Sequence, residues 1–154
     1  MNIILVRHAK AEQSFSKPDI QRDLNPNGKK DIRKKAQRLT EKLEKENKLY
    51  CFSSSANRAR QTAEIIIEEL EQQSFQIEKI EDLGIYHGDF TLVENELYNF
   101  ENNDTLLIVG HQPTLSFWAR EWSDNYISFS TGDMACFKIL SESPLKAEFL
   151  WKIE

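Results

Sequence analysis

Two short apolar runs in the chain each end beside a histidine. Residues 2–6 read Asn-Ile-Ile-Leu-Val and lead into Arg7 and His8, while residues 105–109 read Thr-Leu-Leu-Ile-Val and lead through one glycine into His111. Continuous aliphatic runs of this length predict strands buried on both faces of a parallel sheet. Ligands bind beyond the carboxyl ends of such strands, so both histidines are expected at one functional edge. One histidine after a strand is typical of a residue that only caps a loop, whereas two histidines at the same sheet edge favour a functional site.

The rest of the pattern alternates between strand and helix periods. A helix is predicted to begin with Asn25 as N-cap and Pro26 in its first position. Further helices are predicted from 54–58 through Leu70, at 93–100 and at 115–121. Further strands are predicted at 49–53, at 75–83 with Phe75, Ile77 and Ile80 inward, and as an antiparallel pair at 133–140 and 147–153. This order predicts one α/β domain over residues 1–154, with a mixed, mostly parallel sheet between helices on both faces.

Two polar segments call for an interpretation. The loop from Ala9 to about Leu24 is too long for a simple connector, and we interpret it as an element of the site. In the helix that follows, apolar residues recur at helical spacing at Ile32, Ala36, Leu39 and Leu43. The basic residues between them predict a solvated helix face, ahead of a partner-docking role. These basic residues are Lys29, Lys30, Arg33, Lys34 and Lys35.

Composition narrows the class of protein. The chain has 154 residues, 40% hydrophobic and 29% charged, as in a globular domain. The net charge of −5 argues against a general surface for nucleic acid or anionic membrane. The amino terminus enters a strand without a signal region, which predicts a cytoplasmic location. Cys51 and Cys136 both fall inside predicted strands, where a reduced thiol packs as a small hydrophobe.

Four residues carry the predicted chemistry: Arg7, His8, Arg58 and His111. Each is expected at the carboxyl end of a strand or at the helix start just beyond it. Two guanidiniums and two imidazoles on an acidic protein suit a dianion such as a phosphoryl group. The helix that begins near Asn57 adds backbone donors and a favourable dipole.

A neutral imidazole is a competent nucleophile toward phosphorus. We therefore expect His8 to be unprotonated on its attacking nitrogen, with its other nitrogen donating to a carbonyl. The neighbouring Arg7 disfavours the imidazolium form of His8. His111 is expected to remain protonated and to donate to the phosphoryl oxygens as their charge develops.

Several ordered segments resemble the histidine phosphatase superfamily, which is phosphoglycerate mutase-like. Its opening signature is similar to the segment 6–12, Val-Arg-His-Ala-Lys-Ala-Glu. Asp19 and the segment 22–28 resemble the loop-to-helix region of the small bacterial protein phosphohistidine phosphatase branch. The segments 54–63, 109–113 and 130–132 resemble the blocks with the second arginine, the second histidine and the last motif. Ala9 and Ser55 depart from the glycine and proline that are frequent in the family.

The resemblance implies a role for each of the four residues. It makes His8 the phosphorylated nucleophile, with Arg7, Arg58 and His111 binding and stabilising the transferred group. It also implies a metal-independent phosphatase that needs no cofactor and acts on a phosphohistidine-bearing protein, with a small phosphomonoester as the alternative substrate. A phosphohistidine substrate suits a site without an evident acid, because imidazole leaves more readily than an alkoxide.

Other side chains are weaker candidates. Glu81 and Asp82 are the candidate proton donors, and Asp89 is a third carboxylate in the same region. His87 is interpreted as a loop residue at the pocket rim, and Trp118, Trp122 and Trp151 as core. Substrate contacts are expected from residues beside the four central ones or in the last motif, namely Lys10, Gln112, Thr131 and Gly132.

Four other functions compete with that of a histidine phosphatase, and the sequence argues against each of them. A cysteine-dependent phosphatase fails on spacing, because six residues separate Cys51 from Arg58 and the loop between them has no glycine. A metal hydrolase lacks a ligand motif around His8, His87 or His111. A phosphate- or phosphoprotein-binding module does not need two histidines. A mutase needs a donor acid and a lid that are not evident in the sequence.

Overall fold

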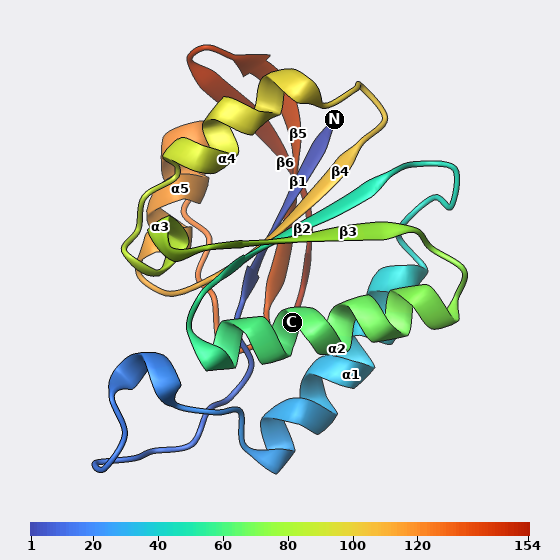
Figure 1. The fold of residues 1–154 in the computed structure, drawn as a ribbon. Helices are drawn as coiled ribbons and strands as arrows, with labels where there is room; N and C mark the ends of the chain where they lie inside the picture. Colours follow the sequence, from blue (N-terminus) through green and yellow to red (C-terminus); the bar gives the residue numbers. More distant parts are fainter.

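In the computed structural model, residues 1–154 form three layers, with one six-stranded sheet between two layers of helices (Figure 1). The strand order is β3-β2-β4-β1-β5-β6, with three parallel pairings and two antiparallel ones at the β5–β6 side. The predicted α/β class and mixed, mostly parallel sheet are confirmed. The strands are β1 (Asn2–Arg7), β2 (Leu49–Ser54), β3 (Ile77–Asp82), β4 (Thr105–Gly110), β5 (Met134–Glu142) and β6 (Leu145–Ile153).

Helices cover both faces of the sheet, as Figure 1 shows. Helices α1 and α2 pack on one face, and the other helices pack on the opposite face. The α-helices are α1 (Pro26–Thr40), α2 (Asn57–Gln72), α3 (Leu83–Tyr86), α4 (Thr91–Glu96) and α5 (Thr114–Ser123), and 3-10 turns lie at Asp19–Gln21 and Leu97–Asn99. No helix is both long enough and apolar enough to cross a membrane.

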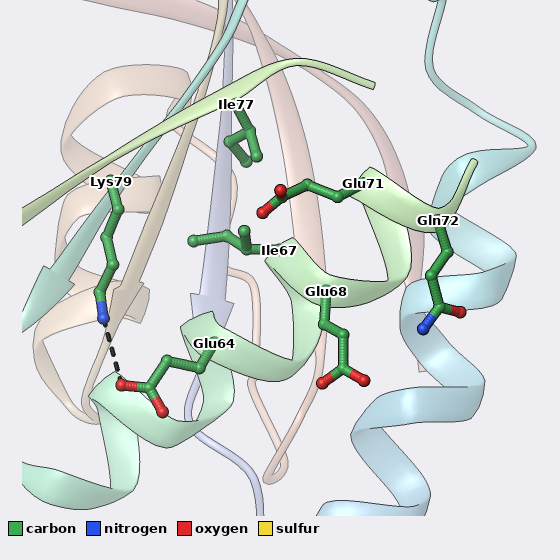
Figure 2. A pocket seen from close by; sticks show the side chains of 7 residues that line it. All are labelled: Glu64, Ile67, Glu68, Glu71, Gln72, Ile77 and Lys79. Atoms are coloured by element: carbon green, nitrogen blue, oxygen red, sulfur yellow. Dashed lines mark hydrogen bonds and ion pairs between the residues drawn. The ribbon is translucent and has the colours of Figure 1, made fainter. Parts of the chain in front are cut away.

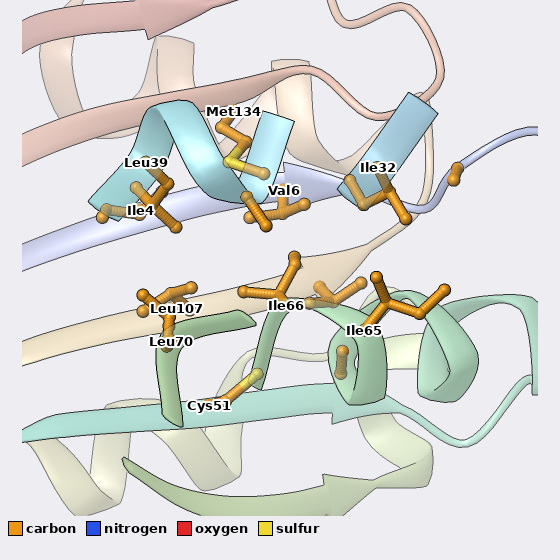
Figure 3. Close-up of a cluster of buried hydrophobic side chains, with 14 of the residues drawn as sticks. Ile4, Val6, Ile32, Leu39, Cys51, Ile65, Ile66, Leu70, Leu107 and Met134 are labelled. Atoms are coloured by element: carbon orange, nitrogen blue, oxygen red, sulfur yellow. The ribbon is translucent and has the colours of Figure 1, made fainter. Parts of the chain in front are cut away.

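The two apolar layers follow from the alternation of side chains along the central strands. Ile4 and Val6 of β1 point to the layer under α1 and α2, whereas Ile3 and Leu5 point to the layer under α5. Figure 3 shows the first layer, where Ile66 and Leu70 of α2 meet β1 and β4. Burial on both faces explains why the central strands are uniformly aliphatic.

The start of α1 forms as its sequence predicts. Asn25 Oδ1 accepts a hydrogen bond from the Gly28 amide at 2.7 Å, and Pro26 occupies the first position. The helix ends at Thr40, so Leu43 packs against the core from the segment beyond it. The cap fixes the direction in which the loop before it enters the helix.

Three expectations about these elements need correction. Lys35 is buried rather than solvated, because its Nζ donates to the Thr131 carbonyl at 3.2 Å and to Asp133 Oδ1 at 3.3 Å. The strand predicted at 75–83 is shorter, and its Ile80 packs on the opposite layer from Ile77 because side chains three residues apart in a strand face opposite ways. The helix predicted at 93–100 begins earlier, and its second half is a 3-10 turn.

Replacing Gly28 with alanine is expected to destabilise the fold. A Cβ atom there would lie 2.2 Å from the Lys10 carbonyl oxygen, which also accepts the Asn25 amide at 3.0 Å. Because backbone rather than a flexible side chain is in the way, the loop must move, at a cost of about 1–3 kcal/mol. Urea unfolding measures this cost. Lys29→Ala, at an exposed position in the same turn, is the control, and equal stability of the two variants would contradict the prediction.

Candidate active site

The register of β1 and β4 brings the two histidines together. Arg7 lies opposite Gly110 in this parallel pair, and the His8 amide donates to the Gly110 carbonyl at 3.1 Å. The next residue on each strand is a histidine, and the ring centroids of His8 and His111 lie 5.2 Å apart. Backbone pairing between neighbouring strands therefore places the two histidines side by side.

A pocket of about 460 Å³ opens beside these rings at the carboxyl edge of the sheet. It carries four basic side chains, three arginines and one lysine, and no carboxylate lines it. This concentration of positive charge on a protein of net charge −5 suits a small dianion. The lining residues are Arg7, His8, Lys10, Ala11, Gln13, Arg22, Arg58, His111, Gln112 and Thr131.

His8 is arranged as a neutral imidazole with one nitrogen available for attack. Its Nδ1 lies 2.7 Å from the Ala9 carbonyl oxygen. Because a carbonyl oxygen can only accept a hydrogen bond, Nδ1 must carry the proton and donate. Its Nε2 then carries the lone pair, and Arg58 Nε donates toward it at 3.4 Å. Burial first, then the charges of Arg58 and Arg7, lowers the pKa of His8 to about 4. This geometry agrees with the expected donation to a carbonyl.

His8 is therefore expected to stay neutral in the folded protein until the pH falls to about 4. Nitrogen NMR shifts of the ring should titrate there, while the urea-unfolded chain should titrate near the ordinary value of about 6.5. Since the unfolded state binds this proton more readily, folding stability should decrease as the pH falls from about 6.5 toward 4. A folded-state midpoint above pH 6 would contradict both expectations.

His111 differs from the expectation that it remains protonated. Burial first, then the nearby His8 and Arg58, lowers its pKa to about 3, so the ring is neutral in the free protein. Its Nε2 lies 2.8 Å from the Ser54 hydroxyl, and its buried Nδ1 has no hydrogen-bond partner within the protein. Sequence alone shows neither how deeply this ring is buried nor how closely His8 and Arg58 approach it. A bound dianion would supply the charge that favours protonation.

The two central arginines are held by backbone and carboxylate oxygens. Arg7 Nη1 donates to the Phe129 carbonyl at 2.9 Å. Arg58, which is buried, donates to the Asp19 carbonyl at 2.9 Å and to its Oδ2 at 3.0 Å. Fixed donors of this kind need little reorganisation when a phosphoryl group binds between them.

Thr62 links the loop after β1 to α2. Its hydroxyl accepts the Ala9 amide at 3.0 Å and donates to the Arg58 carbonyl at 2.7 Å, four residues earlier in the helix. The side chain is fully buried. It thus joins the residue after His8 to the residue that supplies the second guanidinium.

The predicted substrate-binding residues divide into two groups. Lys10, Gln112 and Thr131 line the pocket. Gly132 does not line it; its amide donates to the carbonyls of Arg7 and His8, both at 3.1 Å, with a left-handed φ of 81°. Glycine suits this position because other residues are strained at such a φ.

The candidate proton donors lie outside the pocket lining. Glu81 pairs with Arg60 Nε at 3.3 Å, and Asp89 accepts from the amide and hydroxyl of Thr91. Asp82 caps α3 by accepting the Gly84 amide at 2.8 Å, and its strand position lies opposite Ser54, which contacts His111. Of the three carboxylates, Asp82 has the most direct connection to the site.

His87 and Cys51 lie outside the pocket beside His8. His87 is exposed, with its ring against that of Tyr86 at 5.2 Å, and it lines a separate hollow beside α5 rather than the phosphoryl pocket. Cys51 is completely buried in β2, where burial raises the pKa of its thiol to about 12. A thiolate nucleophile is therefore excluded there. Trp118 and Trp122 lie in the core, as predicted.

Sequence reasoning assigned no role to several residues that build the site. Asp19 and Arg22 belong to the part of the loop that resembles the family, and this resemblance was the one sign in the sequence that they contribute to the site. Ser54, Thr62 and Tyr86 carry no signal of their own, because their roles depend on contacts between elements.

A larger hollow of about 610 Å³ lies on the outer side of α2 against β3, as Figure 2 shows. Glu64, Glu68 and Glu71 line it, and Lys79 is already paired with Glu64 at 3.2 Å. Carboxylates repel a phosphoryl dianion, so this hollow does not suit the chemistry of the histidine pocket.

A family model described as the histidine phosphatase superfamily, branch 1, matches residues 3–91, a range that contains Arg7, His8 and Arg58. The chain belongs to the histidine phosphatase superfamily. The family resemblance found in the sequence is thus confirmed. No protein of the curated set matches this chain.

Solved structures of histidine phosphatases share its fold. The structure described as the protein histidine phosphatase SixA complexed with tungstate has a TM-score of 0.79 and 26% identity, with 100% of this chain and 97% of that chain covered. SixA from Agrobacterium tumefaciens has a TM-score of 0.77 at 19% identity, with 99% and 97% covered. A mycobacterial glucosyl-3-phosphoglycerate phosphatase has a TM-score of 0.68 at 9% identity, with 97% and 96% covered.

Proposed function

We propose that this histidine phosphatase hydrolyses phosphohistidine on proteins through a phosphorylated His8. The observation that carries the proposal is the unprotonated Nε2 of His8, which accepts a long hydrogen bond from Arg58 Nε at 3.4 Å in a cationic pocket while Nδ1 donates to a carbonyl. A phosphoryl group bound to the Arg58 guanidinium would lie beside this lone pair, which can attack phosphorus once the long hydrogen bond is given up.

The reaction proceeds in two displacements. His8 Nε2 attacks phosphorus, a new P–N bond forms, and the bond from phosphorus to the substrate imidazole breaks. The electron pair stays on that imidazole, whose other nitrogen carries a proton, so that the ring leaves as neutral imidazole. Water then attacks the phosphorylated His8, which releases inorganic phosphate and returns the neutral ring. The guanidiniums of Arg7 and Arg58 stabilise the equatorial oxygens in both transition states, and His111 donates to them once the dianion favours its protonation.

Two arguments support a phosphohistidine protein as the substrate: similarity to a solved protein histidine phosphatase, and the chemistry of the leaving group. The chain is 26% identical to a protein histidine phosphatase over its whole length. In addition, none of the candidate acids lines the pocket, and an imidazole leaving group depends less on an acid than an alkoxide does. Metal independence is part of the proposal, because fixed guanidiniums supply the positive charge that a metal would otherwise provide. A cytoplasmic location also remains a prediction.

A small phosphomonoester is the second candidate substrate. Lys10 and Arg22 add two cations to the pocket wall beside the central residues, where they could pair with another anionic group of a small molecule. An ester of this kind needs a proton on its leaving oxygen, and Asp82 is the nearest candidate donor by strand position.

The test compares phosphate release from a phosphohistidine protein, a phosphoserine peptide and small esters, each with and without excess chelator. The proposal expects release from the phosphohistidine protein to be fastest and unchanged by the chelator. Release confined to small esters would overturn the protein substrate, and loss of activity that one added metal restores would overturn metal independence. Stable binding of the phosphoprotein without release would favour a binding module.

A further inference from the structure

Asp19 contacts two of the pocket arginines with different atoms. Its Oδ2 accepts from Arg58 Nη2 at 3.0 Å, and its Oδ1 accepts from Arg22 Nε at 3.1 Å. Its backbone carbonyl also accepts from Arg58 Nη1 at 2.9 Å. One residue of the long loop therefore bridges two guanidiniums that line the pocket from different elements.

Tyr86 holds the same carboxylate from α3. Its hydroxyl donates to Asp19 Oδ2 at 2.8 Å, and its ring lies edge-on to His111 with 5.5 Å between centroids. Although partial burial acts in the opposite direction, hydrogen bonds from Tyr86 and Arg58 lower the pKa of Asp19 to about 2. The bridge is thus a charged carboxylate throughout the working pH range.

The bridge has a consequence for the orientation of Arg58. Two guanidiniums repel each other, and a shared carboxylate offsets that repulsion and fixes their separation. Because Asp19 engages Nη1 and Nη2 of Arg58, the remaining Nε is directed at His8 Nε2. A small rotation of this planar group would displace the donors that face the reacting phosphorus.

We propose that Asp19, held in place by Tyr86, is a positioning residue that sets the orientation of Arg58 and its spacing from Arg22 for phosphoryl transfer. This inference rests on the proposed reaction at His8. It assigns a function to a loop carboxylate that contacts two pocket arginines and does not itself line the pocket.

Asp23 offers a matched control in the same loop. Its Oδ1 accepts from Gln61 at 2.8 Å and from Asn57 at 3.1 Å, so it also ties the loop to the start of α2. It makes no hydrogen bond to Arg22 or Arg58 side chains. Asp19→Asn and Asp23→Asn therefore remove the same charge from the same loop, but only the first removes the bridge.

The experiment is a double-mutant cycle of Asp19→Asn and Tyr86→Phe. For each variant, kcat is measured on the phosphorylated substrate that the wild type hydrolyses, and the affinity for inorganic phosphate is measured by calorimetry. Asp19→Asn is expected to lower kcat about tenfold without weakening phosphate binding, since a nearby negative charge is removed while the geometry of Arg58 is lost. Tyr86→Phe is expected to lower kcat severalfold alone and to have no further effect with Asp19→Asn, because Tyr86 acts through Asp19.

Three results would overturn the inference. They are a kcat within twofold of the wild type for Asp19→Asn, a parallel loss of kcat and phosphate affinity, and an equal loss of kcat for Asp23→Asn. A wild type that hydrolyses only small esters would overturn the proposed substrate instead, and the cycle would then be measured on the ester. The two failures are thus distinguishable.

Discussion

Replacing His8 with alanine is expected to lower kcat at least about a thousandfold, because the covalent route through the imidazole is lost with its nucleophile. The fold should persist, since the backbone hydrogen bond from His8 to Gly110 does not involve the ring. Phosphate release measures the loss. Quenching in alkali during turnover should trap a phosphorylated chain in the wild type and none in His8→Ala.

The matched control is His87→Ala. His87 is the one histidine outside the phosphoryl pocket, and it contacts Tyr86 through ring packing alone. We expect it to retain wild-type kcat within a small factor. If His8→Ala kept a tenth of the wild-type rate, or if the trapped phosphoryl group were found on another residue of the chain, His8 would not be the nucleophile.

Replacing Arg58 with lysine is expected to lower kcat/KM about a hundredfold although the charge is retained. A lysine presents one ammonium at the end of a flexible chain and cannot engage Asp19 with two nitrogens while a third faces His8. The loss should appear mainly in kcat, because charge alone still attracts the dianion while the orientation of the donors is gone.

Arg60→Lys is the control for this change. Arg60 lies in the same helical turn as Arg58, pairs with Glu81 at 3.3 Å and does not line the pocket. Steady-state kinetics on both variants separate charge from geometry. A loss below threefold for Arg58→Lys would show that the planar fork is not needed.

The elements that bring the four central residues together could be predicted from the sequence. The aliphatic runs before His8 and His111 indicate buried parallel strands, and the carboxyl ends of such strands meet at one edge. The structure confirms this neighbourhood, with the two rings 5.2 Å apart and both arginines in the same pocket. The cap at Asn25 was also predictable, because it depends on residues within one turn.

What the sequence did not predict depends on contacts between distant segments. Lys35 follows the pattern of a solvated helix face, yet Asp133 and the Thr131 carbonyl lie where they can pair with it. The neutral state of His111 likewise depends on how closely the pocket cations pack, which periodicity cannot show. The bridge from Asp19 to Arg22 and Arg58 joins a loop to a helix and has no local signature.

The parallel register of β1 and β4 also bears on how such enzymes diversify. Residues 8 and 111 follow a paired position of the central sheet, so the spacing of their backbones is set by main-chain pairing rather than by the loops around them. Exchanges at Lys10 and Gln13, which line the pocket, can therefore alter which molecule is admitted, provided that Asp19 and Arg22 are kept to hold Arg58 in place. Libraries that vary Lys10 and Gln13 alone should yield new substrate preferences on an unchanged chemical step.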